Sequence, residues 1–156
     1  MYDSVNDVKI VAAIVAATIG ASAADATGVT IDRTGYEAVA FDFNVGAEGD
    51  TLSGSVKHVF VVEHSHDANG DGTPDGWEAV VAGDLVLPEW AANIVFATGG
   101  VVLTIDAGGE APAVGSVGYV GGRKFVRCSV DNTGTTNGTP MAINARLSKP
   151  HFAPIS

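Results

Sequence analysis

The sequence predicts an all-β fold: a single domain built as an antiparallel two-sheet β-sandwich of jelly-roll type, with extended termini. Three observations predict it. Hydrophobic residues make up 46% of the 156 residues and charged residues 17%, which is enough apolar material for a continuous core. Strand candidates recur about every ten residues, separated by turn residues that include many of the 20 glycines. Few stretches repeat apolar residues at helical spacing.

The first half of the chain holds five strand candidates. Tyr36 to Val45 alternates most clearly, and its odd-numbered apolar residues from Val39 to Val45 predict the face that points to the core. The other four are residues 9–18, 28–32, 55–64 and 77–81, the last as the returning strand of a hairpin. Residues 9–18 are followed by a Gly/Ala/Ser turn, and a short N-terminal helix is the alternative there.

The second half continues the pattern. Residues 94–105 contain two apolar runs split by Gly99-Gly100, and residues 141–147 form the last strand candidate. Residues 116–120 and 123–130 flank Gly121-Gly122, which predicts a two-residue hairpin. Residues 87–92 are the candidate for a short helical turn opened by Pro88.

This pattern predicts the organisation of the domain. Eight to ten strands in one layer would leave a large apolar face open, so we expect two packed sheets. We divide the chain into an N-terminal strand or arm (1–26), a sandwich domain (27–148) and an extended C-terminal tail (149–156).

The apolar run from Ile10 to Ala24 is similar to a signal peptide, but its flanks differ. Asp3 and Asp7 precede it with Lys9 as the one basic side chain, whereas a signal peptide begins with net positive charge. The run is also too short to span a bilayer as a helix, so we interpret it as a strand and expect no membrane partner.

The charge and the cysteine count exclude two further classes. The net charge is −10, from 18 acidic and 8 basic residues, so we expect no nucleic-acid partner. Cys128 is the single cysteine, which rules out an internal disulfide, and its apolar surroundings predict a small buried side chain.

The loop from Asp67 to Glu78 has the ligand spacing of an EF-hand-type calcium site. Oxygen-bearing residues occupy positions 1, 3, 5, 7, 9 and 12 of the window, with a glycine at position 6 to make the bend. The candidate ligands are Asp67, Asn69, Asp71, Thr73 (through its carbonyl), Asp75 and Glu78. The alternative is a solvated hairpin tip, because Asp, Asn and Gly are ordinary turn residues and no amphipathic helices flank the loop.

Histidines 58, 64 and 66 all have even numbers, so they would lie on one face of an extended strand. This suggests a zinc site, and the alternative is ordinary histidines on a polar strand face. Catalytic arrangements such as a nucleophile elbow or a phosphate-binding glycine loop are missing from the sequence. We therefore expect a structural or binding protein and not an enzyme.

Three segments resemble a family of small structural proteins encoded among the head and tail genes of tailed bacteriophages. They are Arg33 to Val39 leading into Phe41 to Gly46, then Val61 to Asp67, then Gly118 to Arg127. The closing residues Lys149 to Pro154 are similar to that family's tail. The chain differs by inserting the loop from Asp67 to Gly76, so the resemblance implies nothing about calcium.

The resemblance implies a β-sandwich virion protein, a decoration (cement) protein on the capsid exterior that binds the major capsid protein as a homotrimer. Its alternative within the same class is a tail or head-tail connector component. A secreted calcium-dependent binding module is the alternative from a different class, and it requires cleavage of the first 24 residues.

Overall fold

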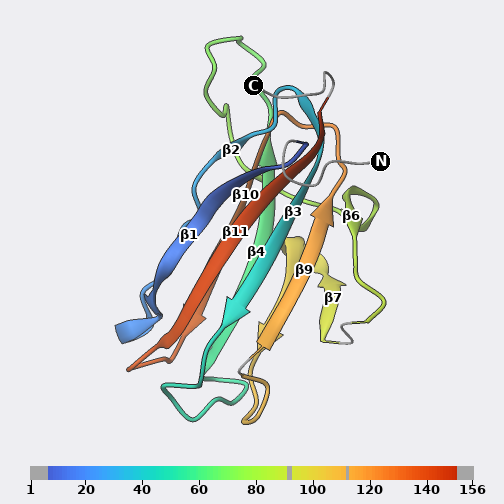
Figure 1. The fold of residues 1–156 in the computed structure, drawn as a ribbon. Helices are drawn as coiled ribbons and strands as arrows, with labels where there is room; N and C mark the ends of the chain where they lie inside the picture. Colours follow the sequence, from blue (N-terminus) through green and yellow to red (C-terminus); the bar gives the residue numbers. More distant parts are fainter. Residues whose placement is uncertain (1–6, 91–92, 112, 151–156) are drawn as a thin grey trace.

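The computed structural model describes residues 7–90, 93–111 and 113–150, and these form two antiparallel sheets packed face to face (Figure 1). Sheet A has the order β1 (Lys9–Ile19), β11 (Thr139–Pro150), β3 (Tyr36–Val45), β9 (Ala113–Tyr119) and β6 (Leu85–Val86). Sheet B has the order β2 (Ile31–Asp32), β10 (Phe125–Thr133), β4 (Lys57–Ser65), β8 (Val101–Ile105) and β7 (Ile94–Ala97), and β5 (Glu78–Ala79) pairs with β4. Three short 3₁₀ turns complete it: η1 (Ala21–Ala23), η2 (Ala82–Asp84) and η3 (Thr98–Gly100). No helix in these ranges has the length and apolar character needed to cross a membrane.

The strand pairs are nested along the chain. β1 pairs with β11, β2 with β10, β3 with β9 and β4 with β8, all antiparallel, so the first four strands pair in reverse order with the last four. Successive members of each half alternate between the two sheets. This is jelly-roll connectivity, with β5, β6 and β7 inserted between β4 and β8 in the chain. It confirms the predicted two-sheet sandwich.

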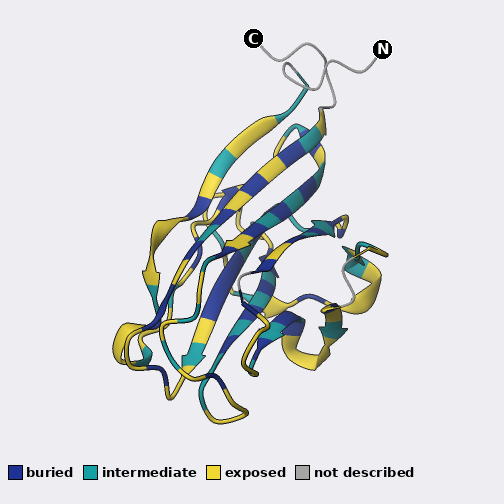
Figure 2. Ribbon diagram, turned by 60° about the horizontal axis from the view of Figure 1, so that its bottom comes forward, coloured by how far each residue is buried: buried dark blue, intermediate teal, exposed yellow. Residues whose placement is uncertain are grey.

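The core lies between the sheets and is built from the alternation that the sequence shows. Phe41, Phe43 and Phe60 are almost fully buried, and the rings of Phe43 and Phe60 meet edge to face with centroids 5.3 Å apart. Figure 2 shows buried and less buried residues alternating along the strands. Cys128 is buried in this core, as predicted.

The predicted hairpin at Gly121-Gly122 is wrong. β9 and β10 lie in different sheets, so the segment between them crosses from sheet A to sheet B. A Cβ at position 121 would lie 2.6 Å from an Asp84 carboxylate oxygen and from the Tyr119 hydroxyl, so this glycine permits close packing of a crossover. Gly99-Gly100 does form a turn, between the antiparallel strands β7 and β8.

Two smaller predictions also need correction. Residues 87–90 contain a turn at Glu89 and Trp90 and no helix, while Ala91 and Ala92 lie outside the described residues. The nearby helical turn is η2, where Asp84 accepts the Val81 N–H. The expected strand over 77–81 is reduced to β5. The termini, residues 1–6 and 151–156, lie outside the described ranges.

Candidate functional site

The first half of the predicted calcium loop is held by its own hydrogen bonds. Asp71 accepts the Thr73 N–H (2.8 Å) and hydroxyl (2.6 Å), and exchanges two further bonds with the Asn69 amide (both 3.0 Å). Asp67 accepts the Gly72 N–H and pairs with the Lys124 ammonium at 2.6 Å. The Thr73 hydroxyl lowers the pKa of Asp71, and Lys124 lowers that of Asp67.

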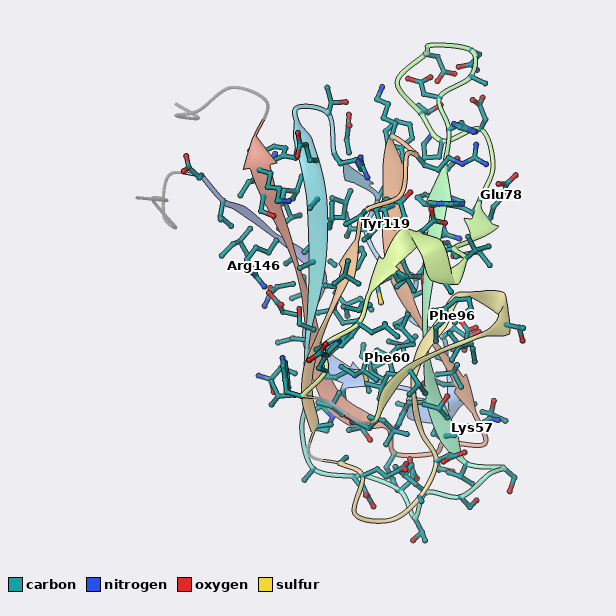
Figure 3. All side chains as sticks on the ribbon, turned by 90° about the vertical axis from the view of Figure 1, so that its right-hand side faces the viewer. Lys57, Phe60, Glu78, Phe96, Tyr119 and Arg146 are labelled. Carbon is teal, nitrogen blue, oxygen red and sulfur yellow. The ribbon has the colours of Figure 1, made fainter. Side chains whose placement is uncertain are left out.

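The second half of the loop separates its two acidic residues. Asp75 accepts the Ala68 N–H inside the loop. Glu78 lies in β5 (Figure 3). Its carboxylate pairs with Arg123 at 2.9 Å, so the ligand expected at position 12 of the loop faces a cationic side chain instead. Within the described ranges, no group of three or more His, Cys, Asp or Glu side chains has the geometry to hold a metal. The structure thus gathers the residues from 67 to 75 but leaves Glu78 apart.

Two of the three histidines are buried, which corrects their assignment to a polar face. His58 is fully buried, with its ring nitrogens bonded to Asn132 and to the Thr139 hydroxyl (3.0 Å). Because the Asn132 amide nitrogen donates to two carbonyls, its oxygen accepts from His58 Nδ1–H, and Nε2 accepts from Thr139. His58 and His64 share the core-facing parity of β4, while His66 is exposed beyond the strand.

His64 belongs to a buried polar cluster at the end of the sandwich where β4 and β9 end and β10 begins, which we call the upper end. Tyr119, which is fully buried, accepts the Arg123 N–H (3.2 Å), and its hydroxyl also shares a hydrogen bond with His64 Nδ1 at 3.0 Å. The Asp84 carboxylate lies 3.8 Å from the same nitrogen. Burial lowers the pKa of His64, against an opposing effect of Asp84, and this favours the neutral ring.

Parts of the three segments quoted for the resemblance meet in this upper end: the start of the first, the end of the second and the crossover of the third. Arg33 donates to the Gly121 carbonyl and lies over the Tyr119 ring, 5.3 Å from its centroid. β10 pairs with both β2 and β4 here, with Phe125 beside Asp32 and Ser65.

Charged side chains of the same segments pair across this end. Arg127 binds Glu63 at 2.8 Å and stacks on Trp77 at 4.2 Å. Segments that are far apart in the sequence therefore form one framework, in which each named ionisable group faces a partner. Figure 3 shows Tyr119 between the sheets, in contrast to Arg146 on the outer face.

The outer edge of sheet A is a second candidate. β1 is 11 residues long with Lys9 as its one charged residue, whereas the other edge strands of the described chain, β2, β6 and β7, have two to four residues. Ile10 and Val15 are 67% and 70% exposed. The Ala13 carbonyl accepts the Val29 N–H, at the first of two bulges. A long apolar edge of this kind is suited to strand addition.

A hollow of about 430 Å³ lies beside this edge on the outer face of sheet A. It is lined mainly by small or apolar residues of β1, β3 and β11: Ala16, Ala17, Thr18, Asn44, Gly46, Pro140, Met141 and Ala142. Higher on the same face, Asp42 pairs with Arg146 (3.1 Å) and accepts the Ser116 hydroxyl, so the main charges there are neutralised. The arrangement favours contact with a protein surface.

Comparisons with known proteins returned no match to this chain, whether against family models, curated proteins or solved structures. The arguments below therefore rest on the residues and their geometry. The jelly-roll strand order alone does not decide the class, because this fold serves both viral capsid and lectin domains.

Proposed function

We propose that this chain is a virion structural protein, a decoration protein that binds the outer surface of a tailed-phage head and stabilises the shell. The observation that carries the proposal is the convergence of the three resembling segments. They supply Arg33, His64, Tyr119 and Arg123 to one packed cluster, so the residues on which the resemblance depends have a structural role in this chain.

The β1 edge is the surface that we assign to the major capsid protein. A shell subunit that adds a strand there gains backbone hydrogen bonds, and its side chains reach the hollow beside Ala16 and Thr18. Repetition over a symmetric shell, with the chain as a homotrimer, adds strength through multivalency without further chemistry. The net charge of −10 favours a basic partner surface.

The first test is the copy number of the chain in purified virions, measured by quantitative mass spectrometry against the major capsid protein. A ratio near one to one supports decoration. A handful of copies would assign the chain to the connector or tail instead. Its absence from virions would refute the virion role and favour the secreted binding module.

The second test addresses the surface. Val15→Lys places a charge on the β1 edge, and Val81→Lys is the matched control because Val81 is 62% exposed and lies before η2. We expect Val15→Lys to abolish binding to shells that lack the protein, while Val81→Lys binds as the wild type does. Equal binding of both variants would show that β1 is not the contact.

A further inference from the structure

The chain contains two Asn-Gly pairs in contrasting surroundings, Asn69-Gly70 in the long loop and Asn137-Gly138 before β11. Asparagine followed by glycine is open to attack of the glycine nitrogen on the side-chain amide carbon, because no side chain shields that nitrogen. The reaction requires the amide carbon to approach the nitrogen, so the local structure decides whether it occurs.

The surroundings of Asn69 favour this approach. Its Oδ1 accepts the Asp71 N–H and its Nδ2 donates to the Asp71 carboxylate, so the side chain curls back over Gly70. The N–H on Oδ1 stabilises the negative charge that develops there during attack. Gly70 has a φ of 75° with open space around it, and no acceptor among the described residues holds its N–H.

The surroundings of Asn137 oppose it. Its Nδ2 donates to the Gly49 carbonyl (3.0 Å) and to Asp50 (3.1 Å), which holds the side chain away from Gly138. Asp50 also accepts the Gly138 N–H at 2.9 Å. Gly138 is buried, and backbone atoms of Ile19 and Ala21 lie within 2.7 Å of where its Cβ would be.

We propose that Asn69 is a site of spontaneous deamidation in the folded protein and that Asn137 is protected. The Gly70 nitrogen bonds to Asn69 Cγ, the Cγ–Nδ2 bond breaks, and ammonia leaves with the proton from the Gly70 N–H. Water then opens the five-membered imide at either carbonyl, which yields aspartate or isoaspartate at position 69.

The product changes the loop tip. A new carboxylate replaces the amide that donated to Asp71, so two like charges face each other where a hydrogen bond was. The loop then carries four carboxylates from 67 to 75. The isoaspartate form also adds a methylene to the backbone beside Gly70.

The test is peptide mapping of the intact folded chain after incubation in mildly alkaline buffer. Cleavage after glutamate releases residues 64–78, with Asn69 as the one asparagine, and residues 111–156, which hold Asn137. We expect the first peptide to gain about one dalton and split into two chromatographic forms. Its rate should exceed that at Asn137, read from fragment ions, by about tenfold or more.

The same chain unfolded in urea is the control, since both pairs then lose their surroundings and should react at similar rates. Asp50→Ala should speed the reaction at Asn137 in folded protein. Equal rates at the two sites in the folded chain, or an unreactive Asn69 there, would overturn the proposal whatever the variant does.

Discussion

Tyr119→Phe is the sharpest probe of the upper-end cluster, because it removes one oxygen from a ring that is fully buried. Two groups lose their partner. His64 Nδ1 loses its hydrogen bond to the hydroxyl oxygen at 3.0 Å, and the Arg123 N–H loses its acceptor at 3.2 Å.

The magnitude follows from these two losses. A buried polar group left without a partner costs about 1–3 kcal/mol, which applies to His64. The Arg123 amide is part-buried and reached by water, so about 1 kcal/mol is appropriate there. The free energy of unfolding should therefore fall by about 2–4 kcal/mol. With a urea m-value of about 2 kcal/mol/M, the midpoint should fall by about 1–2 M.

Urea unfolding followed by tryptophan fluorescence measures this change. Ser53→Ala is the matched control, since it removes one hydroxyl from an exposed loop residue and should change stability by less than about 0.5 kcal/mol. An unchanged m-value is expected for both variants. If Tyr119→Phe is as mild as Ser53→Ala, the bonds of the Tyr119 hydroxyl to His64 and Arg123 contribute little to stability, which refutes the expected loss.

Four further outcomes are expected. Because Arg123 holds the Glu78 carboxylate, Arg123→Ala should raise the calcium affinity of the loop in isothermal titration, and an absence of binding heat in both proteins would end the calcium hypothesis. Burial holds the pKa of His64 below its ordinary 6.5, so the unfolded state binds more protons than the folded state. The stability of the wild type should therefore decline as pH falls below 6.5. His64→Asn, which keeps an acceptor, should remove that decline in thermal melts. Asp50 accepts the N–H groups of three successive residues, which lowers its pKa. Its contribution to folding stability is present above the ordinary pKa of 3.8 and is lost as pH falls through the pKa of the folded state. Asp50→Asn should therefore flatten the acid side of a plot of melting temperature against pH. Burial raises the pKa of Cys128, so a thiol reagent should react with it in urea and not in native buffer.

Most strands could be predicted from the sequence because their signals are local. Tyr36 to Val45 alternates along its own length, and its apolar parity is the buried one in β3. The order of strands in the sheets is not local. The Gly121-Gly122 pair is typical of a hairpin, but β9 pairs with β3 and β10 with β4, so distant partners placed the two strands in different sheets.

The candidate site shows the same division. The spacing of acidic residues from Asp67 to Glu78 is visible in the sequence. The sequence does not show that the crossover after β9 places Lys124 beside Asp67 and Arg123 beside Glu78. A signal for the buried histidines did exist, because His58 and His64 share parity with Phe60 in β4. Histidine is polar, so its burial depends on hydrogen-bond partners. These partners, Thr139 for His58 and Tyr119 for His64, come from other strands, and the sequence of β4 alone does not show them.

The nested pairing of strands has a consequence for how the chain folds. β1 and β11 are the outermost pair, and joining Lys9 to Leu147 closes a loop of nearly the whole chain. Closing such long loops is slow, on the order of milliseconds to seconds for sandwiches of this type. We therefore expect β1 to dock last and to detach first. During that interval β11 is open to the β1 of another molecule, so concentrated refolding favours strand-exchanged oligomers.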